Sequence, residues 1–115
     1  MPKNRWSIEN WNRLSEHDRA VCLDHLRSTM QGWPHIVERW RKQVAAGEEI
    51  GSDDVRFHFG GGMAVRNILR QVLPDYKLPK IKQSDGTLAQ NWDDFYHGAL
   101  HALATEGEIN AQGAE

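Results

Sequence analysis

The sequence has few cysteines, no long apolar run and no excess of positive charge, and so lacks the features of disulfide-stabilised, membrane-spanning and nucleic-acid-binding proteins. Cys22 is its single cysteine, so no internal disulfide can form and a cytoplasmic setting fits best. No apolar run approaches the roughly 20 residues that a membrane helix needs, and the start lacks the apolar core of a signal peptide. Neither an internal repeat nor a low-complexity tract occurs. With 115 residues, the chain is expected to form one domain with one core.

Net charge is also small. Fourteen Lys and Arg against sixteen Asp and Glu leave −2, which gives no general attraction to nucleic acid or to an anionic membrane. Basic positions 39, 41, 42, 66, 70, 77, 80 and 82 could form one patch, with Trp40 or Tyr76 to stack on bases. The acidic total and the absence of a helix-turn-helix order argue against a nucleic-acid partner.

Apolar residues spaced three and four apart predict a mostly helical chain. Ser15, with an acidic residue three positions later, is a good helix start, and Gly32 ends that helix. Pro34 suits the first turn of the next helix, which stops at Gly47. Ahead of these, Ser7 is expected to cap only a short helical turn. The four main helices are predicted over residues 15–31, 34–46, 53–73 and 91–105.

The predicted fold is therefore all-α. Residues 1–105 are expected to form a single domain packed around the central glycine-containing helix, with one long ordered loop. Residues 106–115 are expected to be a flexible C-terminal tail. Cys22 lies on the apolar face of its helix, so it is interpreted as a core residue.

The most unusual stretch covers residues 57–73, where three consecutive glycines precede a long apolar run. In one interpretation the glycines form a loop and a helix begins near Met63. The free N–H groups of its first turn would then create an anion site. The ligand-binding residues of that site would be His58, Gly60, Gly61, Gly62, Arg66 and Asn67.

In the other interpretation, one helix capped by Ser52 runs over residues 53–73 with the glycines inside it. Each interior glycine costs roughly 1 kcal/mol of helix propensity, which makes sense where another helix crosses closely. Gly98 and nearby alanines on the last helix could supply that close neighbour. Helical spacing favours this continuous helix, and its face comprises His58, Gly62, Val65, Leu69 and Val72.

A resemblance rests on these residues. The order His58-Phe59-Gly60-x-Gly62-Met63-x-x-Arg66-Asn67, followed by Trp92-Asp93-Asp94, resembles a family of small bacterial proteins of uncharacterised activity. The resemblance covers about residues 53–104. The chain departs from the family at Gly61, where a bulky apolar residue is usual, and near Ala64, where an aromatic one is. The resemblance implies a compact helical fold and implies no chemistry.

Residues 74–91 lack helical spacing and contain prolines and a Ser-Asp-Gly turn signal, with a brief strand possible near residues 80–82. A long ordered loop often carries function, so this segment is our first choice for a partner-contacting edge. The apolar residues expected to pin it to the domain are Tyr76, Leu78, Ile81 and Leu88. The partner-binding residues expected on its positive edge are Arg70, Tyr76, Lys77, Lys80 and Lys82.

The last helix carries the candidate chemistry. Asn91 is expected to cap it, and His97 and His101, four residues apart, project from one side with Asp93 in the same row. That spacing can hold a metal ion, although a surface row of polar residues is the ordinary explanation. No glutamate follows the first histidine, so the metalloprotease pattern is missing.

Across the helix contact, Arg66 and His58 are expected to meet Asp93 or Asp94. Such a cluster usually satisfies buried charge and sets how two helices align. It could instead bind an anion or act as acid and base, because histidine titrates near neutral pH.

The leading functional hypothesis is a non-catalytic intracellular protein-binding module, such as a small inhibitor or immunity-type protein of bacterial or phage origin. It rests on ten aromatic residues, on a charge of +3 over residues 1–42 against −5 over residues 43–115, and on the lack of a complete catalytic set. No cofactor is expected, and the partner is expected to be a protein. The alternative is a small-molecule, anion or metal site, possibly enzymatic, at residues 58–67 and the row of Asp93, His97 and His101.

Overall fold

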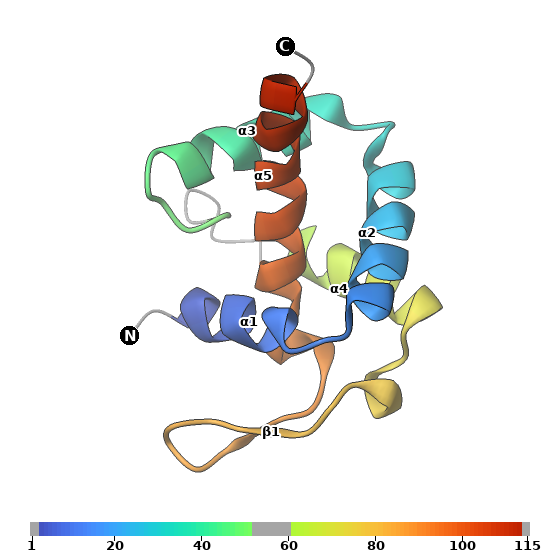
Figure 1. Ribbon diagram of the computed structural model, residues 1–115, viewed down its shortest axis with the longest axis vertical. Coiled ribbons are helices and arrows are strands. Elements are labelled where there is room, and N and C mark those ends of the chain that lie inside the picture. The colour runs from blue at the N-terminus through green and yellow to red at the C-terminus, as the bar shows by residue number, and fades with distance from the viewer. Residues whose placement is uncertain (1–2, 52–60, 114–115) are drawn as a thin grey trace.

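Figure 1 shows helices gathered around α5, with a small hairpin at the lower end of the molecule. The structure, a computed structural model, describes residues 3–51 and 61–113, with side chains over 6–51 and 61–105. The predicted all-α single domain is confirmed. In chain order its elements are α1 (Lys3–Asn12), α2 (Glu16–Met30), α3 (Pro34–Ala45), α4 (Gly61–Val72), η1 (Asp75–Lys77), β1 (Ile81–Lys82), β2 (Leu88–Ala89), η2 (Trp92–Asp94) and α5 (Tyr96–Gly113).

Within the described residues, the helix at the centre is α5, whereas the prediction placed the segment 53–73 there. Helix α5 contacts each of α1, α2, α3 and α4 (Figure 1). Small and apolar residues on several of its sides make this possible, since Ala99, Leu100 and Ala104 are all fully buried. None of the described helices combines the length and apolar character needed to cross a bilayer.

Helices α2 and α3 begin and end close to where the sequence predicts. Ser15 caps α2, because its Oγ accepts a hydrogen bond from the Asp18 backbone N–H at 3.1 Å. Pro34 is the first residue of α3. Gly47, with φ of +75°, follows the end of α3 in a conformation that favours glycine.

Helix α1 is longer than the short turn predicted at Ser7. It begins at Lys3, and Ser7 lies inside it, buried against α5. The Ser7 Oγ accepts a hydrogen bond from the Gly98 N–H at 3.3 Å. Tertiary packing explains the extra length, because α1 buries Trp11 and Ser7 on α5 and most helical stability comes from such a face.

Gly98 is a glycine at which two helices meet closely. A Cβ added there would lie 2.1 Å from the Trp11 Cβ and 2.8 Å from the Ser7 carbonyl oxygen, so no larger residue fits without movement. The close neighbour of Gly98 is therefore α1, and the prediction that it faces the glycines of residues 60–62 is wrong.

Two of the three consecutive glycines are helical. Gly61 and Gly62 begin the described part of α4, where Gly61 is exposed and Gly62 is buried. The helix ends at Val72, ahead of Pro74, as predicted. Gly60 and the rest of the predicted continuous helix lie outside the described residues, so the choice between the two backbone interpretations there stays open.

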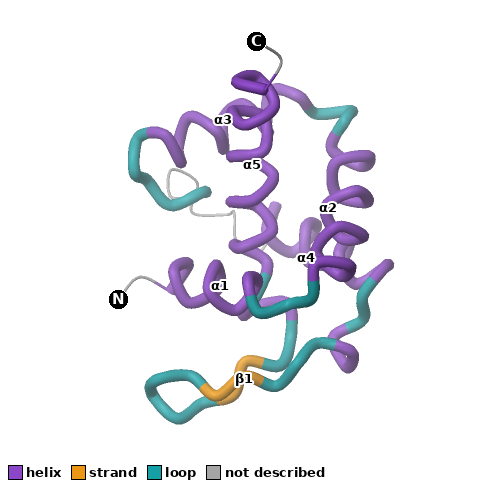
Figure 2. Tube along the Cα trace, viewed as in Figure 1, coloured by secondary structure: helices purple, strands orange, loops and turns teal. Residues whose placement is uncertain are grey.

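The segment after α4 contains a two-stranded antiparallel hairpin (Figure 2), which confirms the brief strand predicted near residues 80–82. Ile81 pairs with Ala89, and both side chains face the domain. Lys82 pairs with Leu88 on the opposite face, which leaves Leu88 exposed. The prediction that Leu88 and Tyr76 pin the segment is therefore wrong, while Leu78 and Ile81 do so.

The C-terminal helix starts later and ends later than the predicted range 91–105. Asn91 is a cap as predicted, accepting from the Asp93 N–H at 2.9 Å, but it caps η2, and α5 begins at Tyr96. Helix α5 then continues to Gly113; the flexibility of residues 106–115 stays a prediction. The largest fully buried side chains of the core are Cys22, Leu26, Leu69, Trp92, Phe95 and Leu100.

Candidate functional site

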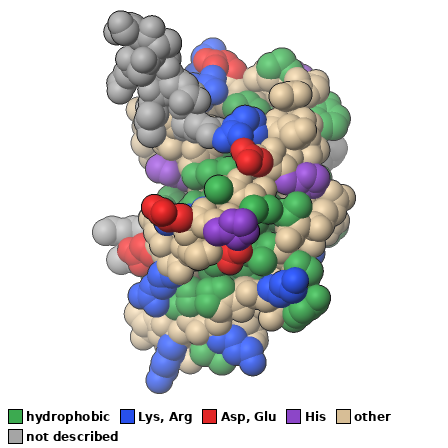
Figure 3. Space-filling view, turned by 45° about the vertical axis from the view of Figure 1, so that its right-hand side comes forward, with side chains coloured by type: hydrophobic (Ala, Val, Ile, Leu, Met, Phe, Trp, Pro, Cys, Tyr) green, Lys and Arg blue, Asp and Glu red, His purple; other side chains and the backbone are tan. Residues whose placement is uncertain are grey.

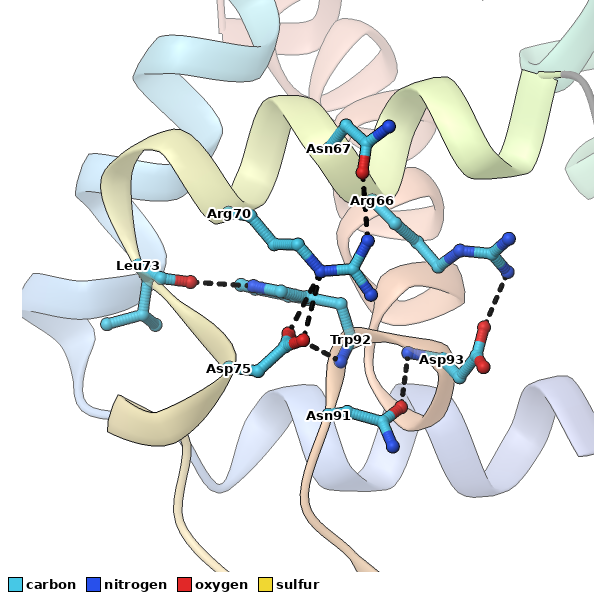
Figure 4. Close-up of polar contacts among 8 residues, drawn as sticks. All are labelled: Arg66, Asn67, Arg70, Leu73, Asp75, Asn91, Trp92 and Asp93. Carbon is cyan, nitrogen blue, oxygen red and sulfur yellow. Dashed lines mark hydrogen bonds and ion pairs between the residues drawn. The ribbon is translucent and has the colours of Figure 1, made fainter.

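Trp92 is the centre of a polar clamp between the end of α4 and the start of α5 (Figure 4). Its indole Nε1–H donates to the Leu73 carbonyl oxygen at 2.7 Å, and its backbone N–H donates to Asp75 Oδ1 at 3.2 Å. Arg70 Nε donates to both carboxylate oxygens of Asp75, at 3.2 and 3.0 Å. Because the indole is fully buried, this Trp92 clamp holds η1 in one place against the core.

Beside the clamp, Arg66 reaches from α4 to η2. Its Nη1 lies 2.6 Å from Asp93 Oδ1, and its guanidinium carbon lies 5.0 Å from the centroid of the Tyr96 ring. The predicted contact of Arg66 with Asp93 is thus confirmed, while His58 lies outside the described residues. Only 5% of the Arg66 side chain is exposed, against 49% for Asp93, so the buried partner of the pair is the cation.

The charges around Tyr96 indicate that the pair of Arg66 with Asp93 holds helices together. Burial raises the pKa of the Tyr96 hydroxyl, and Arg66 acts in the opposite direction. The phenol is therefore neutral near pH 7, and its ring provides a face on which the guanidinium lies. A buried cation satisfied by a carboxylate and an aromatic ring holds α4 against α5 in one alignment.

The residues predicted to bind a ligand do not converge in the described structure. Arg66 points toward Asp93, whereas Asn67 Oδ1 accepts a hydrogen bond from Arg70 Nη1 at 2.9 Å (Figure 4). Gly61 and Gly62 are helical rather than a loop. Since His58 and Gly60 lie outside the described residues, the ligand site as a whole stays a prediction.

The row of Asp93, His97 and His101 receives no support as a metal site. In the part of the chain that the structure describes, no three His, Cys, Asp or Glu residues gather where they could hold a metal ion. Asp93 is paired with Arg66, and the imidazole of His97 lies against the Tyr96 ring, with 4.3 Å between centroids.

Cys22 is a core residue, as predicted. Burial raises the pKa of its thiol to about 12, and the nearby Asp18 charge adds to that shift. The thiolate needed for nucleophilic attack is therefore scarce at neutral pH.

The positive edge predicted in residues 74–91 is present at the lower end of the molecule. Tyr76 is 83% exposed on η1, and Lys77, Lys80 and Lys82 are exposed beside it. On the face shown in Figure 3, the charged side chains at this end are Lys and Arg. Arg70, also predicted for the edge, belongs to the Trp92 clamp instead. We call Tyr76, Lys77, Lys80 and Lys82 the basic edge.

A polar cavity on the other side of the hairpin is a feature that the sequence did not reveal. Its volume is about 310 Å³, and it lies between α1, the hairpin and the start of α5. Asn10 forms part of its wall, donating from Nδ2 to Gln83 Oε1 and to the Asp94 carbonyl oxygen, each at 3.1 Å. These residues are more than 70 positions apart, so no local pattern could bring them together. Its acidic lining residues are Asp85, Asp93 and Asp94.

A second hollow, of about 250 Å³, is an apolar groove where α2, α3 and α4 meet. In the sequence, Ile36 and Trp40 are four residues apart and Val65 and Ile68 three apart, a spacing typical of apolar helix faces that does not reveal a groove between them. Its bulky lining residues are Met30, Trp33, Ile36, Trp40, Val65 and Ile68.

In comparisons with known proteins, no family model, no curated protein and no solved structure matches this chain. The resemblance to a family of small bacterial proteins therefore stays a prediction. Function has to be argued from the surfaces described above.

Proposed function

We propose that this chain is a small non-catalytic protein-binding module of the inhibitor or immunity type, of bacterial or phage origin, and that the basic edge contacts its partner. A cytoplasmic location is part of the proposal, because a single reduced cysteine suits that compartment. Two of its most prominent charged pairs, Arg66 with Asp93 and Arg70 with Asp75, support helix packing. The buried Cys22 is likewise unsuited to catalysis.

One observation carries the proposal: Tyr76 is 83% exposed on a turn that is itself firmly held. Asp75, its neighbour on one side, is bound by Arg70 and by the Trp92 N–H. Leu78, two residues later, is buried in the core. An aromatic side chain presented on an ordered turn loses little entropy on binding, and such residues are typical anchors of protein interfaces.

Quantitative capture from bacterial extracts tests this proposal. Wild-type protein, Tyr76→Ala and the control Lys42→Glu are immobilised in parallel; Lys42 is exposed on α3, far from the hairpin (Figure 1). We expect one protein to be enriched by wild type and by Lys42→Glu and lost from Tyr76→Ala. With that protein purified, calorimetry should show binding weakened by about tenfold or more in Tyr76→Ala.

If Tyr76→Ala captures the same protein as wild type, the basic edge is not the binding surface. If no captured protein binds wild type after purification, the proposed function is contradicted. All three proteins should unfold at the same temperature, because neither substituted side chain is buried.

A further inference from the structure

The three lysines of the basic edge are exposed at one end of the described structure. Among the described residues, no carboxylate pairs with Lys77, Lys80 or Lys82, whereas the nearby Arg70 is bound by Asp75. Exposed ammonium groups held at one end of a small domain attract and orient anions before contact.

The spacing of these lysines follows from the hairpin. Ile81 is buried, so Lys80 and Lys82, on either side of it, project together away from the domain. Two residues of strand advance by about 6.6 Å, which is also the spacing of alternate side chains in another extended segment. Tyr76 and Lys77 lie on η1, next along the same edge.

Resting on the proposed function, we infer that the partner presents a carboxylate-rich extended segment to the basic edge. Asp or Glu residues at alternate positions of that segment face Lys80 and Lys82, and an apolar residue next to them packs on Tyr76. Lysine provides a compact point charge, whereas bidentate recognition of a phosphate group uses the planar guanidinium of arginine. The only arginine predicted for this edge, Arg70, already donates to Asp75 through Nε and to Asn67 through Nη1.

The opposite side of the hairpin argues against a long polyanion such as nucleic acid. Asp85 and Asp94 line the polar cavity there, so a continuous phosphate backbone would run from attracting into repelling charge. The screening length in physiological salt is about 8 Å, which confines the attraction to a short acidic segment close to the lysines.

A random peptide library displayed on phage, selected against the immobilised full chain at low salt, tests this inference. We expect the selected peptides to be acidic, with Asp or Glu two positions apart and an apolar residue adjacent. A synthetic peptide of that consensus should bind the triple variant Lys77→Glu, Lys80→Glu, Lys82→Glu more weakly by about tenfold or more. It should also bind wild type more weakly in high salt, and it should bind Lys42→Glu as it binds wild type.

Neutral or basic consensus peptides, equal binding to the triple variant, or tighter binding of a short duplex DNA than of the peptide would overturn the inference. Failure of this inference is distinguishable from failure of the proposed function. If the selected peptides are not acidic but capture of a protein still depends on Tyr76, the inference fails and the proposed function stands. Because all three lysines are exposed and pair with no carboxylate among the described residues, the triple variant should keep the circular dichroism spectrum of wild type, and this measurement confirms that it folds.

Discussion

Helix α5 meets its neighbours in two different ways. Against α1 the contact is close and mostly apolar, with the backbone of α5 at Gly98 touching Trp11 and Ser7. On the α4 side, contact is made through long side chains: Arg66 of α4 lies over the ring of Tyr96 at the start of α5 and pairs with Asp93 of η2, the turn that leads into α5. The first contact depends on a missing side chain, and the second on charged and polar groups that reach across.

The difference shows that a run of glycines does not by itself reveal which member faces a neighbour, since Gly61 is exposed and the adjacent Gly62 is buried. Gly98 lies so close to Ser7 and Trp11 of α1 that a Cβ has no room there. Gly61, from the run of three, is exposed to solvent. Four experiments test this contrast.

Gly98→Ala should have the largest effect. The new Cβ would lie 2.1 Å from the Trp11 Cβ, so α1 must move and the bond from the Gly98 N–H to Ser7 is weakened. We expect the free energy of unfolding to fall by about 3 kcal/mol or more, measured by urea denaturation. As a control, Gly32→Ala meets no atom within 4 Å and should change stability by less than about 0.5 kcal/mol. Equal small effects at both positions would show that α1 is not closely packed.

Trp92→Phe should rank second. It removes the indole N–H and leaves the Leu73 carbonyl oxygen without that donor in a buried position. We expect a loss of about 2 kcal/mol in the same denaturation assay. Trp33→Phe is the matched control, since Trp33 is 49% exposed and should tolerate the change. If both variants are equally stable, the Trp92 clamp contributes packing alone.

The Arg66–Asp93 pair should contribute less. Asp93 is 49% exposed, so water screens the pair and can replace the carboxylate. A double-mutant cycle with Arg66→Met and Asp93→Ala should give a coupling energy of about 1 kcal/mol. Strictly additive single effects would mean that the ion pair seen across this contact does not stabilise it.

Gly61→Ala should have the smallest effect, with the opposite sign. Gly61 is exposed within α4, and alanine is favoured over glycine in helices by about 1 kcal/mol at most. We expect the thermal midpoint to rise slightly. A fall would indicate that a neighbour packs against Gly61 after all, which would restore the close crossing predicted for the glycine run.

Much of the fold was predictable because its signals are local. The Ser15 cap, Pro34 at the start of α3 and Gly47 after its end each act within a single turn of the chain. The contact of Arg66 with Asp93 was also predicted, because a buried cation needs a carboxylate and few were available on a facing helix.

The candidate surfaces were less predictable. The positive charge of the basic edge can be counted in the sequence, but the exposure of Tyr76 depends on how Asp75 is held from two other elements. The polar cavity depends on Asn10 meeting Gln83 across 73 positions, and no short-range pattern encodes such a meeting.

The sequence by itself determined that this chain is helical, where α2 and α3 begin and end, and which residues are charged at the hairpin, because propensity, caps and charge are properties of neighbouring residues. Only the tertiary structure decided that α5 is the helix that the others pack against, that Gly98 faces α1 and that Tyr76 is exposed. Those outcomes depend on which apolar faces meet, and that is settled by packing the whole domain at once.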